Sequence, residues 1–162
     1  MKNLLVLSDT HLRRADDIPP QLVHEAARAD LVLHAGDFTC IEIVERLEEL
    51  ATMFAVWGNM DDHRVIARLP DACIVEVEGI KIGLTHGSGA PSEAIRNARS
   101  RFDQVDLIVF GHTHHPFNDK WHGIRMFNPG SPTDRRFAPF RCFGWIEVDG
   151  NAFEVRHVDI QD

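Results

Sequence analysis

The stretch "NLLVLSDTH" at residues 3–11 decides how the chain begins to fold. Residues 4–7 are all apolar, and a short continuous apolar run is typical of a strand that is buried on both faces of its sheet. The run stops at Ser8 and Asp9, so the strand is expected to end there in a polar turn. The sequence therefore predicts a buried strand whose carboxyl end carries polar side chains.

Strand and helix signals alternate through the first third of the chain. Strands are predicted at residues 30–37 and 52–59, and helices at residues 19–29, which begin with prolines, and 41–51. This alternation is typical of a sheet whose parallel strands are joined by crossover helices.

The rest of the chain follows a different pattern. Residues 73–87 and 141–158 each read as two strands around a glycine-containing turn, which predicts two hairpins. Between the hairpins we expect a helix, a strand and a turn-rich segment, at residues 92–102, 106–110 and 111–134, respectively. The mixture of parallel and antiparallel signals predicts an α/β fold, a single domain over residues 1–162 in which two sheets pack together and are flanked by helices.

The composition argues against several classes of protein. The formal charge is −8, from 17 Lys and Arg against 25 Asp and Glu, which disfavours long nucleic acids and anionic membranes as partners. No apolar run approaches the roughly 20 residues that span a bilayer, and the first run is too short for a secretory signal, so we expect a cytoplasmic protein. Cys40, Cys73 and Cys142 form no CxxC pair, so we expect free thiols rather than disulfides or a zinc knuckle.

Polar residues that can bind a metal follow one predicted strand after another. In a sheet with parallel strands, ligand sites gather beyond the carboxyl ends of the strands, where loops converge. The candidate ligands at these positions are Asp9, His11, Asp37, Asn59, His86, His112 and His114.

The spacing of these residues is consistent with a shared site. One residue separates Asp9 from His11, so in an extended backbone both side chains would point the same way, about 6.6 Å apart along the chain. His112 and His114 repeat that spacing. Glycines stand beside the candidate ligands, where the backbone has to turn sharply or approach a ligand closely, at positions 36, 58, 87 and 111.

The chemistry of the candidate ligands points to divalent transition metals. Four imidazoles, two carboxylates and one amide, with no thiolate, suit Mn²⁺, Fe²⁺, Zn²⁺ or Ni²⁺. Seven ligands are too many for one catalytic ion that keeps a position open, so two ions that share one carboxylate fit better.

The motifs "DTH", "GD", "GNMD", "THG" and "GHTH" occur in this order from residue 9 to residue 114. In this the chain resembles the calcineurin-like metallophosphoesterases, and "NPGSP" at residues 128–132 further resembles their small bacterial and archaeal YfcE-like branch. The resemblance implies a four-layer α-β-β-α sandwich of two mixed sheets flanked by helices. It also implies two bound divalent ions, with Mn²⁺ expected in assays and Zn²⁺, Fe²⁺ or Ni²⁺ as alternatives.

Carried over position by position, the resemblance implies that Asp9, His11 and His114 hold one ion. Asn59, His86 and His112 would hold the other, and Asp37 would bridge the two.

The implied reaction is hydrolysis of phosphodiester bonds in small or nucleotide-like substrates by a metal-bridging hydroxide, with Asp37, Asn59, His112 and His115 as the catalytic residues. Many family members have a histidine where this chain has Met60, which carries no proton to donate. His115, His63 or a metal-bound water would have to protonate the leaving group, so acidic, aryl-like leaving groups are expected to be favoured.

Two other functions stay open beside this one. The chain could be a phosphomonoesterase, or a protein-interaction scaffold with a vestigial metal site, as in a retromer subunit of the same fold. A full set of competent ligands favours the enzyme over the scaffold. Small family members often form dimers or tetramers, so a homo-oligomer is also expected.

Further polar residues have competing interpretations. Asp61 and Asp62 precede a helical pattern and are expected to be an N-cap and a first-turn acid. Asn128 would either support the metal-binding histidines or form a plain turn. Arg135 and Arg136 would either meet a substrate phosphate or lie in a solvated loop, the second being favoured.

Overall fold

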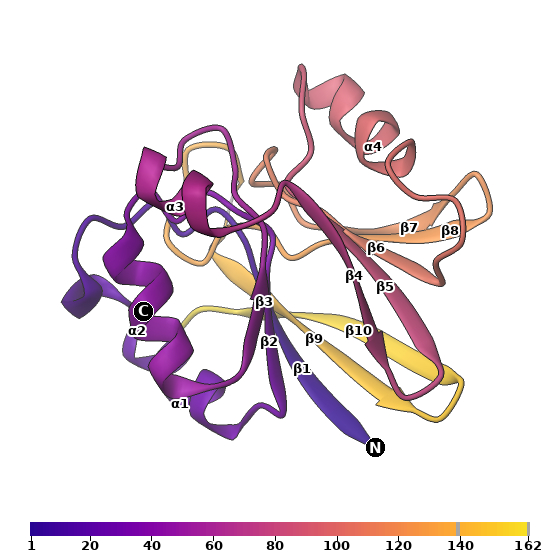
Figure 1. Cartoon of the computed structure of the whole chain (residues 1–162), viewed down its shortest axis with the longest axis horizontal. Coiled ribbons are helices and arrows are strands. Elements are labelled where there is room, and N and C mark those ends of the chain that lie inside the picture. The colour runs from indigo at the N-terminus through magenta and orange to yellow at the C-terminus, as the bar shows by residue number, and fades with distance from the viewer. Residues whose placement is uncertain (139, 162) are drawn as a thin grey trace.

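The computed structural model describes residues 1–138 and 140–161, and it contains two five-stranded sheets (Figure 1). The helices are α1 (Pro20–Arg28), α2 (Ile41–Leu50), α3 (His63–Arg68) and α4 (Pro91–Arg99), with a short 3₁₀ helix at Ala15–Asp17. The strands are β1 (Lys2–Leu7), β2 (Leu31–His34), β3 (Met53–Ala55), β4 (Ala72–Val77), β5 (Ile80–Thr85), β6 (Leu107–Val109), β7 (Phe117–Trp121), β8 (Ile124–Asn128), β9 (Cys142–Asp149) and β10 (Ala152–Asp159).

Both sheets are mixed, as predicted. The first has the order β10-β9-β1-β2-β3 and the second β4-β5-β6-β8-β7. β1 pairs in parallel with β2 and antiparallel with β9, and β6 runs parallel to both β5 and β8. Two hairpins, β4–β5 and β9–β10, cover the predicted positions.

Strand β1 is buried on both faces, as its apolar run predicts. Leu4 and Val6 belong to the core between the two sheets. Leu5 and Leu7 point the other way and pack in the core beneath α1 and α2. All four are fully buried, and burial of each such side chain favours folding by roughly 1.5–3 kcal/mol.

The helices lie outside the two sheets, which gives the expected four layers. Leu22 of α1 and Leu47 of α2 pack on the outer face of the first sheet. Ala98 of α4 and the following Phe102 pack on the outer face of the second sheet. Figure 1 shows α1, α2 and α3 on one side of the molecule and α4 on the other.

The prediction of a turn-rich segment at residues 111–134 was wrong for its middle part, which forms the hairpin β7–β8. β7 reads FNDKW and lies at the edge of its sheet, where most of its side chains face solvent, so it lacks the apolar alternation of a covered strand. The tight turn at His122 and Gly123 has positive φ at both residues (46° and 82°), the geometry of a two-residue hairpin turn.

The parallel strands point their carboxyl ends at the same region of the molecule. β1, β2 and β3 end there in the first sheet, and β5 and β6 in the second. The loops that follow these strands carry all seven candidate ligands. In the part of the chain that the structure describes, no helix is long and apolar enough to span a membrane.

Candidate metal centre

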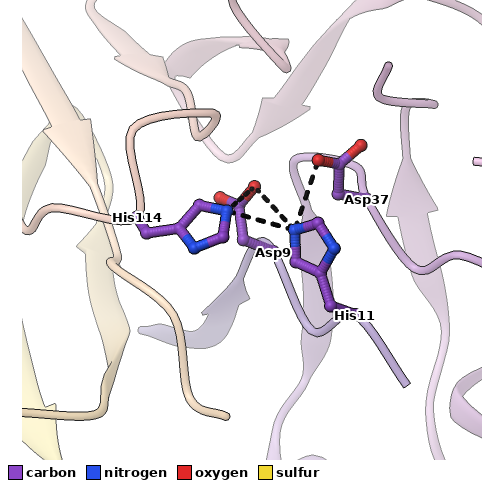
Figure 2. A group of neighbouring side chains, drawn as sticks. All are labelled: Asp9, His11, Asp37 and His114. Carbon is purple, nitrogen blue, oxygen red and sulfur yellow. Dashed lines mark hydrogen bonds and ion pairs between the residues drawn. The ribbon is translucent and has the colours of Figure 1, made fainter. Parts of the chain in front are cut away.

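Four of the candidate ligands form one compact group. Single ligand atoms of Asp9, His11, Asp37 and His114 all lie within 4.8 Å of one another. Figure 2 shows the His11 ring between the carboxylates of Asp9 and Asp37, with the His114 ring beside Asp9. His11 Nε2 lies 3.3 Å from Asp37 Oδ2 and 3.7 Å from Asp9 Oδ1.

The other three candidate ligands form a second group next to the first. Asn59 Oδ1 lies 3.0 Å from His86 Nε2 and 3.1 Å from His112 Nδ1. His86 Nε2 is also 3.3 Å from Asp37 Oδ2. One carboxylate oxygen of Asp37 therefore contacts both groups at the same distance, and the structure brings all seven predicted residues together.

The backbone reaches this arrangement by a route other than the predicted one. Five of the seven residues have positive φ: Asp9 (54°), His11 (42°), Asp37 (61°), His112 (74°) and His114 (60°). The expectation of an extended Asp9–His11 segment, with side chains aligned as on a strand, was wrong. A left-handed conformation costs a non-glycine residue on the order of 1–3 kcal/mol, and such strain concentrates at functional sites.

Two glycines allow the ligand loops to pack closely, as predicted. A Cβ on Gly58 would lie 2.8 Å from His86 Nδ1 and collide with Asp37 Oδ1. A Cβ on Gly111 would lie 2.7 Å from Asp9 Oδ2 and collide with the Ser8 hydroxyl. A larger residue at either position would push a candidate ligand out of its group.

The first group has the electrostatic character of a cation site. Asp9 is fully buried, and its Oδ1 has no hydrogen-bond partner among the residues that the structure describes. His11 Nε2 and His114 Nε2 face each other at 3.1 Å. Burial lowers the pKa of His11, but a hydrogen bond to Asp37 and the nearby carboxylate of Asp9 outweigh it and raise that pKa to about 9. Burial lowers the pKa of His114. Of the two facing rings, His11 therefore holds the proton, and that proton lies at the place where a divalent cation would fit.

The surroundings of Asp37 also favour a bound cation, because they keep its carboxylate charged. Burial raises the pKa of Asp37, but hydrogen bonds from His11 and His86 outweigh it and hold the pKa well below its usual range. His86 Nδ1 lies 2.6 Å from the Ala35 carbonyl oxygen, so this nitrogen donates and Nε2 is left to face Asp37 and Asn59. The donor set of this site, with a buried charged carboxylate and oriented imidazoles, fits divalent cations.

Asp61 has a structural role that its sequence context did not indicate. Of the two acids expected at this helix terminus, Asp62 is the N-cap of α3 and accepts hydrogen bonds from Arg64 N and Val65 N. Asp61 is buried and was wrongly expected to act at the helix terminus. Its carboxylate accepts hydrogen bonds from backbone nitrogens of three residues, at 2.7 Å from Thr39, 2.8 Å from Gly58 and 3.0 Å from Asp37. Asp61 thereby joins the loop that carries Asp37 to the loop that carries Asn59.

His34 packs against the loops that carry Asp9 and Asp37. It is fully buried, and its ring stacks on Phe38 with centroids 3.6 Å apart. Nδ1 accepts a hydrogen bond from Gly36 N at 3.1 Å, and Nε2 lies 3.2 Å from Thr10 Oγ1. Burial lowers the pKa of His34 to about 3, so the ring is neutral.

Two residues of the 128–134 segment position the histidine loop. Asn128 Nδ2 donates to Gly111 O (3.1 Å) and Thr113 Oγ1 (3.0 Å), so Asn128 holds the backbone of that loop rather than the imidazoles. Asp134 Oδ2 lies 3.1 Å from His114 Nδ1. Hydrogen bonds from Arg136 lower the pKa of Asp134 to about 2, so this carboxylate is charged. The sequence pattern predicted Asp134 only as the last residue of a turn-rich segment, although it follows "NPGSP" after a single residue, Thr133.

The remaining candidate residues lie around this centre. Met60 donates its backbone N–H to Asp37 Oδ1 at 2.8 Å, and its side chain is exposed. His63 is exposed at the start of α3, and His115 is exposed next to His114. Beside His11 is an open cavity of about 640 Å³, and the basic residues that line it are Arg135, Arg136 and Arg141.

Comparisons with known proteins agree with this geometry. Residues 1–151 match the model of the calcineurin-like phosphoesterase superfamily domain. The chain is 41% identical to a probable metallophosphoesterase of Methanocaldococcus jannaschii, over 97% of this chain and 81% of that protein. It is 30% identical to the phosphodiesterase YfcE of Escherichia coli, over 67% of this chain and 60% of that protein. The solution structure of a Thermotoga maritima protein matches with a TM-score of 0.77 at 31% identity, covering 99% of this chain and 100% of that one.

Proposed function

Because this chain belongs to the calcineurin-like phosphoesterase superfamily, we propose that it is a divalent-metal-dependent phosphodiesterase acting on small or nucleotide-like substrates. The observation that carries the proposal is the position of Asp37. Its Oδ2 lies 3.3 Å from both His11 Nε2 and His86 Nε2, one from each ligand group. A carboxylate shared in this way is what a two-metal phosphoesterase requires.

Each ligand group would hold one ion, with Mn²⁺ as the ion expected in assays. Asp9, His11 and His114 would bind the first, Asn59, His86 and His112 the second, and Asp37 both. Bound as a pair, such ions lower the pKa of a water molecule and withdraw charge from the phosphoryl oxygens. The chain itself supplies orientation: His86 and His112 are fixed by the carbonyl oxygens of Ala35 (2.6 Å) and Gly89 (2.8 Å).

The surroundings of the centre favour diesters with good leaving groups. Met60 has no proton to donate, although its backbone N–H fixes Asp37. We assign proton donation to His115, because its Nδ1 donates to the Pro116 carbonyl oxygen at 3.1 Å, which leaves Nε2 free to reach a substrate and, in the imidazolium form, to give it a proton. An exposed donor of this kind assists weakly, so aryl diesters should be hydrolysed faster than alkyl monoesters.

A scaffold function with a vestigial metal site is less well supported. All seven ligand positions hold competent side chains, and they lie in contact with one another. The buried Asp9 Oδ1, which accepts no hydrogen bond from the residues that the structure describes, would be a cost without benefit in a protein that binds no cation.

The test combines metal analysis with hydrolysis of bis(p-nitrophenyl) phosphate. Activity should disappear on chelation and return with Mn²⁺. Asp37→Ala should lose bound metal and at least about a hundredfold in kcat/KM, because it removes the shared ligand. Asp103→Ala, at an exposed carboxylate outside the ligand loops, is the matched control and should behave as wild type. Full activity of Asp37→Ala, or activity that survives chelation, would contradict the proposal.

A further inference from the structure

An apolar cavity of about 430 Å³ opens beside the metal centre. Its walls come from α4, from the end of β6, from β7 and from the loop after β8, and Figure 1 shows α4 and the β7–β8 hairpin on the same side of the molecule. The apolar residues that form these walls are Ile95, Phe110, Phe117, Trp121 and Phe137. Among the described residues that line the cavity, none carries a permanent charge.

The cavity is joined to the ligand groups by direct contacts. The ring of Phe137 meets the ring of His114 edge-on, with centroids 5.2 Å apart at 89°. His114 Nε2 in turn lies 3.4 Å from Asp9 Oδ1. Thr113, which lies between two proposed metal ligands in the chain, also lines the cavity, as does His115. A phosphate held at the centre therefore has this cavity within reach of one of its ester groups.

The volume of the cavity and the residues that line it indicate which chemical group it binds. Its volume falls within the range of small-molecule sites and exceeds the need of a methyl or ethyl group. Flat aromatic walls pair well with a planar ring, by stacked or edge-to-face contacts. Phe137 is 60% exposed, and an exposed aromatic side chain beside a reactive centre is available to cover such a ring. The arginines at His11 lie in a different cavity, which suits the charged parts of a substrate.

We propose that this cavity binds an uncharged aromatic ester group of the phosphodiester substrate, either an aryl group or a nucleobase. The proposal rests on the phosphodiesterase function proposed above, and it adds the place where the planar ring of such a diester binds. Ile95, Trp121 and Phe137 are then specificity-determining residues rather than catalytic ones, because they contact the ring and not the reacting phosphorus.

The first experiment tests the cavity without metal or catalysis. Chelated, ¹⁵N-labelled protein is titrated with p-nitroanisole, a neutral ring that carries no phosphate. The Trp121 indole N–H and the amides of Ile95, Phe117 and Phe137 should shift together. The shifts should be lost in Ile95→Trp, which fills the cavity from α4, and weakened in Phe137→Ala, which removes a wall. Phe54→Ala, at an exposed phenylalanine on β3, is the matched control and should respond as wild type.

The second experiment tests the role in substrate selection. With the Mn²⁺-loaded protein, phenylphosphonate and methylphosphonate are compared as competitive inhibitors of bis(p-nitrophenyl) phosphate hydrolysis. Wild type should prefer the phenyl compound by about tenfold or more, since the ring leaves water. Ile95→Trp and Phe137→Ala should both reduce that preference to about threefold or less, while Phe54→Ala keeps it.

The outcomes separate the two proposals. If the Mn²⁺-loaded wild type does not hydrolyse bis(p-nitrophenyl) phosphate, the phosphodiesterase function is overturned. The titration with p-nitroanisole then still decides whether the cavity binds rings. Absence of shifts at the cavity residues, or an unchanged phenyl preference in both cavity variants, would overturn the aromatic subsite. Shifts of the same amides on simple dilution without ligand would also overturn it, because they would show a second copy of the chain covering the cavity.

Discussion

Asp61→Asn is expected to lower the free energy of unfolding of the metal-free protein by about 2 kcal/mol, and Asp62→Asn by less than about 0.5 kcal/mol. The two residues are neighbours in sequence with different partners. Asp62 uses one oxygen to accept hydrogen bonds from the amides of Arg64 and Val65, and an asparagine oxygen can do the same.

The larger cost at Asp61 follows from its three partners. Oδ2 accepts from Asp37 N (3.0 Å) and Gly58 N (2.8 Å), and Oδ1 accepts from Thr39 N (2.7 Å). An asparagine has only one oxygen, so in either orientation its NH₂ group faces at least one of these buried donors. An unsatisfied buried donor costs about 1–3 kcal/mol. Burial raises the pKa of Asp61, so losing the charge recovers part of the cost, and the estimate stays at about 2 kcal/mol rather than the top of that range.

The assay is urea unfolding of both variants with chelator present, followed by Mn²⁺ titration of the folded proteins. Asp61→Asn should also bind Mn²⁺ more weakly, since it loosens the loops of Asp37 and Asn59, while Asp62→Asn should bind as wild type. Equal stability and equal Mn²⁺ affinity of the two variants would refute the idea that Asp61 holds the loops together.

Three further predictions concern single residues. Between pH 7 and pH 5 the metal-free wild type should lose about 2 kcal/mol more unfolding free energy than His34→Asn. Burial lowers the folded pKa of His34 to about 3, so as pH falls below 6.5 only the unfolded chain takes up the proton, and stability is lost. Parallel pH profiles of the two proteins in urea would contradict this. Asp134→Asn should weaken Mn²⁺ binding about tenfold or more, because it removes the charged partner of His114. Calorimetry compares it with the exposed control Asp16→Asn, and equal Mn²⁺ affinities of the two variants would show that the contact between Asp134 and His114 does not support metal binding. His115→Ala should slow diesters with poor leaving groups more than p-nitrophenyl diesters, and a uniform loss across leaving groups would show that His115 donates no proton.

Sequence patterns predicted most of the fold because its strands and helices have strong local signals. The apolar run at residues 4–7 requires cover on both faces, and the fold supplies it with the second sheet on one side and α1 and α2 on the other. The hairpin β7–β8 escaped prediction because β7 is a polar edge strand whose existence depends on pairing with β8. Nothing in its own residues requires that pairing.

The same contrast holds for the candidate site. The seven proposed ligands were found because each follows a strand and belongs to a recognisable motif. The roles of Asp61 and Asp134 were not predicted. Asp61 depends on backbone amides such as that of Asp37, and Asp134 depends on a ring nitrogen of His114, and both partners lie in loops more distant in sequence. The left-handed backbone at Asp9 and His11 was also not predicted, because tertiary contacts, not local preference, impose it. The single-domain boundary, the cytoplasmic location and the homo-oligomer stay predictions.

Anomalous diffraction from crystals grown with Mn²⁺ tests most directly whether Asp37 bridges two ions. We expect two peaks in each chain, one in contact with Asp9, His11 and His114 and the other with Asn59, His86 and His112, with a carboxylate oxygen of Asp37 within coordinating distance of both. A single peak, or two peaks of which one does not touch Asp37, would contradict the shared-carboxylate centre on which the proposed chemistry depends.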